Sequence, residues 1–366
     1  MVLYCAIAAL ITGCSSVGYY RQAAAGQYQI FSCQEPIEKV LARPDTKPEL
    51  RQKLQLVLDL RQFAESELHL ETGGHYAKYA DLGRRYVVWN VYAAPEFSLE
   101  PKKWWYPVVG SLKYRGYFSE QAARDYGTNM TREGYDVYVG GVDAYSTLGW
   151  FKDPVLNTFI NNPTAELAET LFHELAHQRV FAKGDTDFNE AFASAVGEEG
   201  ARRWLAAHGD AKSRAAYDAE LRRKDQFVAI VMRARERLKK VYGEESGHTP
   251  RAQPQPGSES LVIAKRAEKA QVQAQLRADY AALKASWGGD TSYDAWFKRP
   301  INNARLNTVA TYYHFVPAFQ RLLANNGGDL QKFYTEAKTL SGLDMEQRHA
   351  RMAALAGIPN KTVAAQ

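Results

Sequence analysis

Residues 162–194 read NPTAELAETLFHELAHQRVFAKGDTDFNEAFAS, and this stretch decides the fold of the second half of the chain. Asn162 followed by Pro163 is typical of a helix start, because asparagine caps well and proline at the first helical position has no amide to leave unpaired. The pattern predicts a helix to about Ala182, where a glycine and an aspartate interrupt it. A second helix is expected from about Asp187.

The first of these helices carries His173, Glu174, Leu175, Ala176 and His177. Residues four apart on a helix lie one above the other, so both imidazoles can reach one metal ion. Zinc binds neutral imidazole nitrogen, and Glu174 beside the ion is placed to take a proton from water. The sequence therefore predicts one zinc ion, with Glu174 as the general base.

A catalytic zinc site needs a third protein ligand. A third histidine six residues after the second is excluded, because Lys183 stands there. Glu190 is the candidate, since small residues on its side of the second helix, such as Gly197, allow the two helices to approach closely. A competing interpretation makes Glu190 part of a capping box with Asp187 as the N-cap. The alternative ligands are Asp185, Asp187, Glu198 and Glu199.

The remaining helices and strands are predicted from the spacing of hydrophobic residues and from the positions of proline and glycine, which interrupt regular structure. Strands are expected at 86–94, within 104–118 and at 135–142, and an amphipathic helix at 48–70. After residue 163 the chain is predominantly helical, with long charged helices at about 211–242 and 261–287. The prediction is an α+β fold in which a small antiparallel or mixed sheet packs against the metal-binding helix. A long helical pair, 206–290, is inserted in the C-terminal half and contains a proline-rich loop, 244–260.

Composition limits the class of protein. The chain has 366 residues, of which 46% are hydrophobic and 24% charged, so one large globular domain with insertions, or two domains, are expected. The net charge is only +5, and no nucleic-acid-binding motif is present, so no nucleic acid is expected as a partner.

The N-terminus has the pattern of a secreted lipoprotein. An apolar run is followed by Ile11, Thr12, Gly13 and Cys14, which resembles a bacterial lipobox and predicts a signal peptide at 1–13 and lipidation of Cys14. No basic residue precedes Arg21, which departs from that pattern. An ordinary cleaved signal or a buried apolar N-terminus is the alternative. The expected organisation is a signal at 1–13, an N-terminal segment at 14–46 and a metallopeptidase domain at 47–366.

The histidine pair followed by Asn189, Glu190 and Ala191 resembles the gluzincin, or thermolysin-like, metallopeptidases. The wider chain resembles a bacterial family of predicted zinc aminopeptidases with lipoprotein signals. The similar segments are 86–99, 114–118, 140–154, the metal helix and 302–323. The resemblance implies that His173, His177 and Glu190 bind zinc and that Glu174 is the base. Two features depart from the thermolysin-like pattern: only twelve residues separate His177 from Glu190, and Ser194 stands where that group often has an aspartate.

Thermolysin-like enzymes bind substrate along an edge strand, and Gly140, Gly141 and Asp143 are the candidates for that role here. Asp143 could hold a free amino terminus, or it could be a turn aspartate that accepts backbone amides. A hydrolase also needs a donor to the developing oxyanion, and the candidates are Tyr312 and Tyr313, next to an expected helix kink at Pro317.

The motifs and the resemblance together predict a zinc-dependent peptide hydrolase that is lipid-anchored in the bacterial envelope, and the resemblance implies that it is an aminopeptidase. Its expected location is the outer membrane, facing the periplasm. The alternatives are a zinc endopeptidase acting on envelope proteins or cell-wall peptides, and a non-catalytic lipoprotein scaffold with structural zinc. An open coordination position distinguishes catalytic from structural zinc, because four protein ligands close a structural site.

Overall fold

The structure is a computed structural model that describes residues 18–106, 110–144, 151–244 and 259–357. The lipobox and most of the proline-rich loop lie outside these residues. Within the described part, none of the helices combines the length and the apolar character needed to cross a membrane.

The strands are short and form three small sheets. β3 is the centre of an antiparallel sheet of order β6-β3-β7, β2 joins β1 and β8 in a mixed sheet, and β4 pairs with β5. The bounds are β1 Gln34–Pro36, β2 Lys78–Ala80, β3 Val88–Pro95, β4 Trp104–Tyr106, β5 Gly110–Leu112, β6 Arg115–Tyr117, β7 Tyr135–Val142 and β8 Val155–Leu156.

Helices make up most of the remainder of the described chain, beginning with residues 18–32. The bounds are α2 Ile37–Ala42, α3 Pro48–Ser66, α4 Glu120–Arg132, α5 Thr164–Arg179, α6 Thr186–His208, α7 Ala211–Tyr242, α8 Glu259–Ser286, α9 Asp294–Lys298, α10 Asn303–Tyr313, α11 Val316–Asn325, α12 Leu330–Ser341 and α13 Met345–Ala356. The predicted α+β fold, predominantly helical after residue 163, is confirmed.

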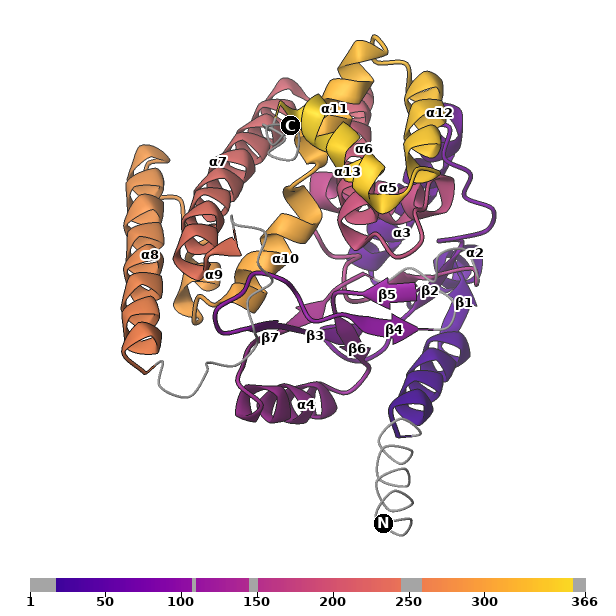
Figure 1. Cartoon of the computed structure of the whole chain (residues 1–366). Helices are drawn as coiled ribbons and strands as arrows, with labels where there is room; N and C mark the ends of the chain where they lie inside the picture. The colour runs from indigo at the N-terminus through magenta and orange to yellow at the C-terminus, as the bar shows by residue number, and fades with distance from the viewer. Residues whose placement is uncertain (1–17, 107–109, 145–150, 245–258, 358–366) are drawn as a thin grey trace.

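The β6-β3-β7 sheet separates two layers of helices. α4 covers one face of the sheet, and α5 and α6 lie on the opposite side (Figure 1). Side chains alternate along β3, so Trp89 and Val91 pack towards α4 in a small cluster, whereas Val88 and Asn90 face the helices of the other layer. α10 packs directly against β3 and β7, and α5 lies across a cleft from the sheet.

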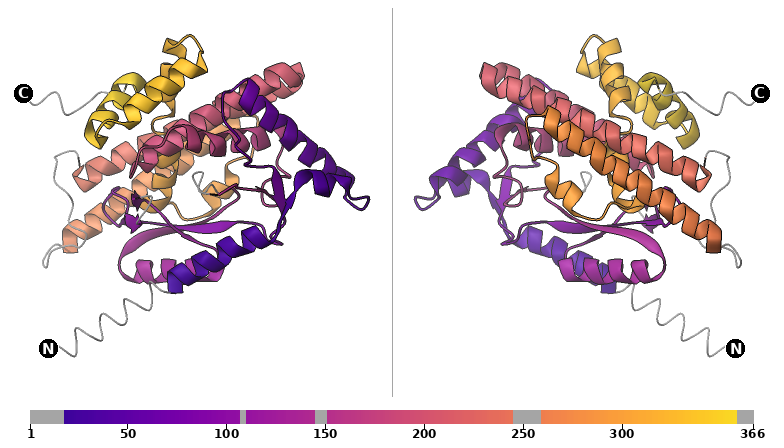
Figure 2. Two further views of the ribbon diagram at one scale, coloured as in Figure 1. Left: turned by 90° about the vertical axis from the view of Figure 1, so that its right-hand side faces the viewer. Right: turned by 90° about the vertical axis from the view of Figure 1, so that its left-hand side faces the viewer.

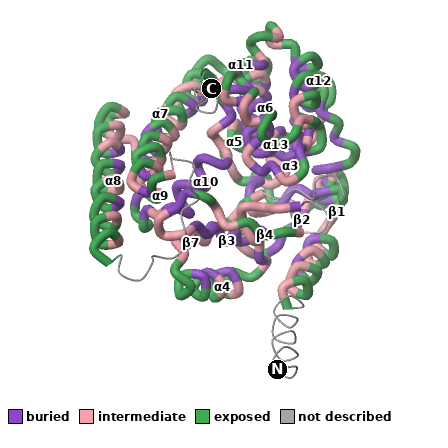
Figure 3. Tube along the Cα trace, viewed as in Figure 1, coloured by how far each residue is buried: buried purple, intermediate pink, exposed green. Residues whose placement is uncertain are grey.

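The main core surrounds α5 and α6. Its fully buried side chains include Phe172, Phe188, Phe192 and Phe319, and α6 is buried along most of its length (Figure 3). α7 and α8 run side by side as a long antiparallel pair (Figure 2). Core positions of this pair, among them Ile230, Leu276 and Tyr280, belong to a second cluster that continues into α9 and α10.

Three local expectations differ from the structure. The N-cap of α5 is Pro163 itself, and the Asn162 side chain bonds to Glu166 instead of to the backbone. The N-cap of α6 is Asp185, two residues before the expected Asp187, because the Asp185 carboxylate accepts from Phe188 N at 3.2 Å. The chain breaks before Pro317 instead of kinking, since α11 starts anew and accommodates the proline in its first turn.

Candidate metal centre

Close contact between α5 and α6 brings the candidate ligands together. A Cβ atom on Gly197 would lie 2.7 Å from the carbonyl oxygen of Glu169, so only glycine permits this approach of the two helices. The connecting loop is held by Asn189, which accepts from Ala182 N at 2.7 Å and donates to Ala182 O at 2.9 Å. The side chain of Asn189 thereby fixes the start of α6, and with it the next residue, Glu190.

Three ligand atoms converge there. His173 Nε2 and His177 Nε2 are 3.2 Å apart, and Glu190 Oε2 lies 3.4 Å from the first and 3.7 Å from the second. Tetrahedral zinc with bonds of about 2.0–2.1 Å holds its ligand atoms about 3.3 Å apart. The donor set and its spacing therefore fit a zinc ion. No fourth His, Cys, Asp or Glu of the described residues joins this group.

The rival acids have other partners. Glu198 pairs with Lys224 at 2.9 Å, and Glu199 pairs with Arg203 at 2.8 Å. Asp187 lies 2.5 Å from Lys113. Asp185 receives hydrogen bonds from two side chains of α13, Arg348 and His349. Of the candidate acids, Glu190 is thus the one placed beside both imidazoles, and the interpretation of Glu190 as a capping-box partner of Asp187 is wrong, because Asp185 is the N-cap.

Burial dominates the electrostatics of the cluster. It raises the pKa of Glu174 to about 7, against the charge of His173, and lowers the pKa of His177 to about 4. Burial alone would lower the pKa of His173, but its hydrogen bond to Glu190 raises it. Burial likewise pushes the pKa of Glu190 upward, yet the two imidazoles hold it below its ordinary value. The neutral form of His177 is the form that coordinates a metal.

Behind Glu174 lies a buried polar group that sequence reasoning missed. Tyr76 has a positive φ of 57°, and its backbone amide donates to Asp153 O at 2.7 Å. Its hydroxyl is buried and has no hydrogen-bond partner within the described part of the chain. Burial raises the pKa of Tyr76 well above its ordinary value, and the charges of Glu174 and Asp153 act in the same direction. Nothing in the sequence signals this residue, because its position depends on a loop conformation.

The structure separates the two candidate tyrosines. The Tyr312 ring stacks on His173 with centroids 6.4 Å apart, whereas the Tyr313 ring lies under Lys224, 5.7 Å from its Nζ. Burial raises the pKa of Tyr312 well above its ordinary value, so its phenol remains protonated. Tyr312 therefore lies beside the candidate metal ligand His173, and Tyr313 lies towards Lys224 of α7.

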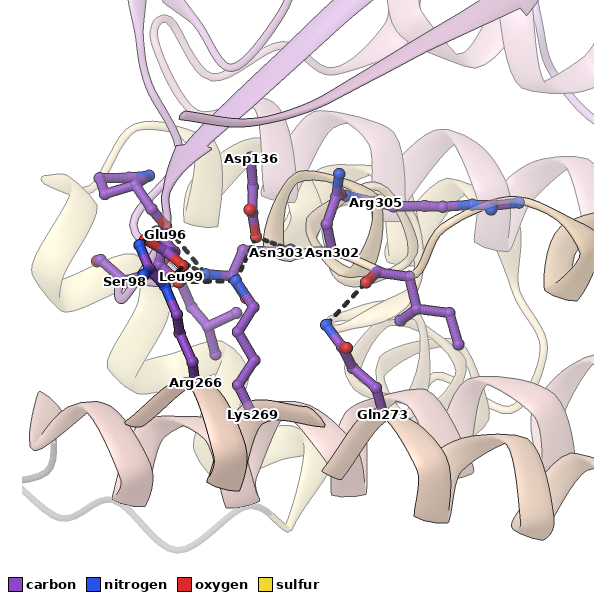
Figure 4. A network of polar contacts seen from close by, with 12 residues as sticks. Glu96, Ser98, Leu99, Asp136, Arg266, Lys269, Gln273, Asn302, Asn303 and Arg305 are labelled. Carbon is purple, nitrogen blue, oxygen red and sulfur yellow. Dashed lines mark hydrogen bonds and ion pairs between the residues drawn. The ribbon is translucent and has the colours of Figure 1, made fainter. Parts of the chain in front are cut away.

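A polar network holds α10, the helix that carries Tyr312, against the sheet (Figure 4). The Asn303 side chain is fully buried and donates to the carbonyl oxygens of Pro95, Glu96 and Ser98. Asp136 of β7 accepts from the backbone N–H of Asn303 at 2.9 Å and from Lys269 of α8 at 2.6 Å. α8 is thus connected to the sheet and to α10 by charged side chains as well as by apolar packing.

A cleft of about 830 Å³ runs between the sheet and α5, and the cluster of His173, His177 and Glu190 lines it. Of the predicted substrate-binding residues, Gly140 pairs with Asn90 on the cleft side of the sheet. Gly141 faces the opposite side, where an added Cβ would meet the Tyr86 ring. Asp143 is exposed and is not among the cleft residues, although its neighbours Val142 and Ala144 are. β7 is an edge strand within the described sheet.

Several other cleft residues escaped sequence reasoning. Carboxylates of Glu166, Glu169 and Glu220 line the cleft beyond the metal centre, together with Lys224. Residues 18–32 also contribute to its wall, through Tyr19 among others. The periodicity of α5 places Glu166 and Glu169 on the same side as His173, two turns and one turn before it, whereas Glu220, Lys224 and Tyr19 reach the cleft through packing between distant segments.

The fold and the site define an α+β protein in which three side chains that could bind one metal ion line an open cleft. Its family follows from comparison with protein-family models: residues 18–352 match the model described as "Putative aminopeptidase", and the chain belongs to that family. No curated protein and no solved structure matches the chain.

Proposed function

We propose that the protein is a zinc-dependent aminopeptidase anchored to the bacterial envelope through Cys14. The observation that carries the zinc site is the convergence of His173 Nε2, His177 Nε2 and Glu190 Oε2 at separations of 3.2–3.7 Å. Three protein ligands beside a cleft are typical of catalytic zinc, which keeps a position open for water or substrate. The family description supports the aminopeptidase activity.

The residues around the site have roles that follow from their chemistry. Zinc bound there would supply an activated water and a Lewis acid for the peptide carbonyl. Glu174, 9% exposed and adjacent to His173, accepts the proton of the attacking water and passes it to the leaving amine. Tyr312, which is protonated and stacks on His173, donates to the oxyanion that develops on the scissile carbonyl.

Charge in the cleft favours a substrate with a free amino terminus. Glu166, Glu169 and Glu220 line the cleft beyond the candidate ligands, and Lys224 pairs with Glu169 at 3.0 Å, so carboxyl groups outnumber cations there. A negative, partly enclosed surface attracts an ammonium group and disfavours the blocked terminus of an acetylated peptide. This balance supports an aminopeptidase over an endopeptidase.

The experiment compares trialanine with N-acetyl-trialanine, using protein loaded with one equivalent of zinc and protein treated with a chelator. We expect the zinc-loaded protein to release alanine from trialanine and to cleave the acetylated peptide at least tenfold more slowly. Chelation should abolish both reactions, and added zinc should restore them. Hydrolysis that survives complete zinc removal would overturn the proposal, and equal cleavage of the two peptides would replace the aminopeptidase with an endopeptidase.

A further inference from the structure

Asn90 lies at the centre of the sheet face that borders the cleft. The residues that pair with it on the two neighbouring strands have no side chains. Asn90 lies on the central strand β3, and its register partners on both sides are glycines, Gly116 in β6 and Gly140 in β7. Its side chain lines the cleft together with Val88 and Gly116. Across three strands this row of paired residues therefore presents one side chain, a carboxamide.

The two glycines are not required by backbone conformation, because neither has a positive φ. At Gly116, the one atom that an added Cβ would approach within 4 Å is Asn90 Oδ1, at 3.2 Å. At Gly140, a Cβ would lie 2.9 Å from the Tyr138 ring. Gly116 lines the cleft and leaves Asn90 Oδ1 unobstructed on that side, whereas the Tyr138 ring fills the space next to Gly140. Glycine inside a strand is typical of a place that a ligand or another group approaches closely.

The hydrogen bonds of Asn90 are incomplete. Nδ2 donates to the Tyr92 hydroxyl at 3.4 Å, and Oδ1 accepts from no donor in the described part of the chain. The side chain is only 6% exposed. Oδ1 does not belong to the fully buried, unpartnered side-chain atoms of the described residues, and Asn90 lines the cleft, so this oxygen can accept a hydrogen bond from a ligand there.

Asn90 is also close to the reacting centre. The hydroxyl of Tyr92, which accepts from the Asn90 amide, also lies close enough to Tyr312 to affect its pKa. Tyr312 in turn stacks on His173. The carboxamide therefore faces the metal centre across the floor of the cleft.

We infer that Asn90 binds the main chain of the peptide substrate in the row between Gly116 and Gly140. Oδ1 accepts a hydrogen bond from a main-chain N–H of the peptide, and the second Nδ2 hydrogen donates to a main-chain carbonyl. An asparagine side chain matches the peptide group because it carries one acceptor and donors in the same plane. This inference rests on the proposed peptidase function and adds a binding residue that is neither a metal ligand nor a proton carrier.

The test uses trialanine and two variants that act on the same contact in different ways. Asn90→Ala removes the amide, and Gly116→Ala keeps the amide but places a methyl group against Oδ1. Gly18→Ala is the matched control, because its added Cβ meets nothing within 4 Å. KM and kcat are measured with zinc-loaded protein, and trialanine binding to zinc-free protein is measured by calorimetry.

We expect Asn90→Ala to raise KM about tenfold while kcat stays within about twofold, as for loss of a contact made equally in ground and transition states. Binding to the zinc-free protein should weaken by the same factor, and Gly116→Ala should show the same direction in both assays. If wild-type protein hydrolyses trialanine and both variants keep its KM and affinity, the inference is overturned and the peptidase proposal survives.

Other results would separate the inference from the peptidase proposal in the opposite direction. Wild-type protein that binds trialanine without hydrolysing it, with binding lost in Asn90→Ala, would refute the peptidase proposal and support the inference. Wild-type protein that neither binds nor hydrolyses trialanine would overturn both. If Asn90→Ala does not fold, the test relies on Gly116→Ala, because that variant keeps the Asn90 side chain in place.

Discussion

Replacing Glu190 with glutamine removes one negative charge from the candidate metal centre and almost no volume. A carboxylate oxygen about 2.1 Å from a divalent ion contributes about 4 kcal/mol even at the dielectric constant of bulk water. That energy corresponds to about a thousandfold in the dissociation constant. We therefore expect Glu190→Gln to bind zinc about a thousandfold more weakly than the wild type.

The assay titrates zinc-loaded protein with a competing chelator while circular dichroism monitors the fold. Glu199→Gln is the control, because its partly exposed ion pair with Arg203 lies outside the site and contributes about 1 kcal/mol. Glu198→Gln tests the nearest rival, and we expect it to retain zinc, since its carboxylate pairs with Lys224. Wild-type zinc affinity in folded Glu190→Gln would refute the assignment of the third ligand.

Three further predictions concern the cleft, the anchor and the support of α6. Tyr312→Phe should lower kcat about 10²–10³-fold with zinc retained, as for loss of an oxyanion donor, whereas Tyr313→Phe stays within a few fold; equal losses in both would contradict the assignment. Cys14→Ala should move the protein from the membrane fraction to the soluble fraction, and a variant that stays in the pellet would refute lipidation. Burial raises the pKa of Asp185, but hydrogen bonds from His349 and Arg348 hold it below its ordinary value. The carboxylate therefore stabilises the fold above pH about 3.9, and this contribution is lost as pH falls through the lower folded pKa. Asp185→Asn should unfold at lower temperature at pH 7 and show a smaller further loss between pH 5 and pH 3; an unchanged pH profile would show that the pair contributes nothing.

Helices were the most predictable part of the fold. The predicted 211–242 helix coincides with α7, because its apolar positions recur at helical spacing and a glycine follows it in the left-handed conformation. Strand boundaries were less accurate: the expected strand region within 104–118 is divided into β4, β5 and β6. Each of these strands has three residues, too few for a period of two to be read from sequence.

The candidate metal centre was predictable only where its residues are neighbours along one helix. The pair His173 and His177 follows from the four-residue repeat of one helix, which needs no tertiary information. The position of Glu190 depends on how closely α6 approaches α5. The sequence alone therefore could not decide which of five acidic residues is the third candidate ligand. The side chain of Asn189 closes the short connecting loop, which explains how a spacing of only twelve residues brings Glu190 to the imidazoles.

Residues from distant segments could not be predicted. Choosing between Tyr312 and Tyr313 requires the rotation of α10 about its axis, which the network around Asn303 sets. Asn90 gives no signal in the sequence, because its glycine neighbours are adjacent only through strand register. Tyr76 lies near enough to Glu174 to feel its charge, and its place depends on a loop residue with positive φ, a conformation that a tyrosine rarely adopts.

The most direct test of a zinc peptidase is the variant Glu174→Gln, which separates metal binding from catalysis. Glu174 lies beside His173 but is not among the three converging ligand atoms. The variant should therefore hold one equivalent of zinc by elemental analysis and release alanine from trialanine about 10²–10⁴-fold more slowly than the wild type. Full zinc occupancy with undiminished hydrolysis would contradict the account.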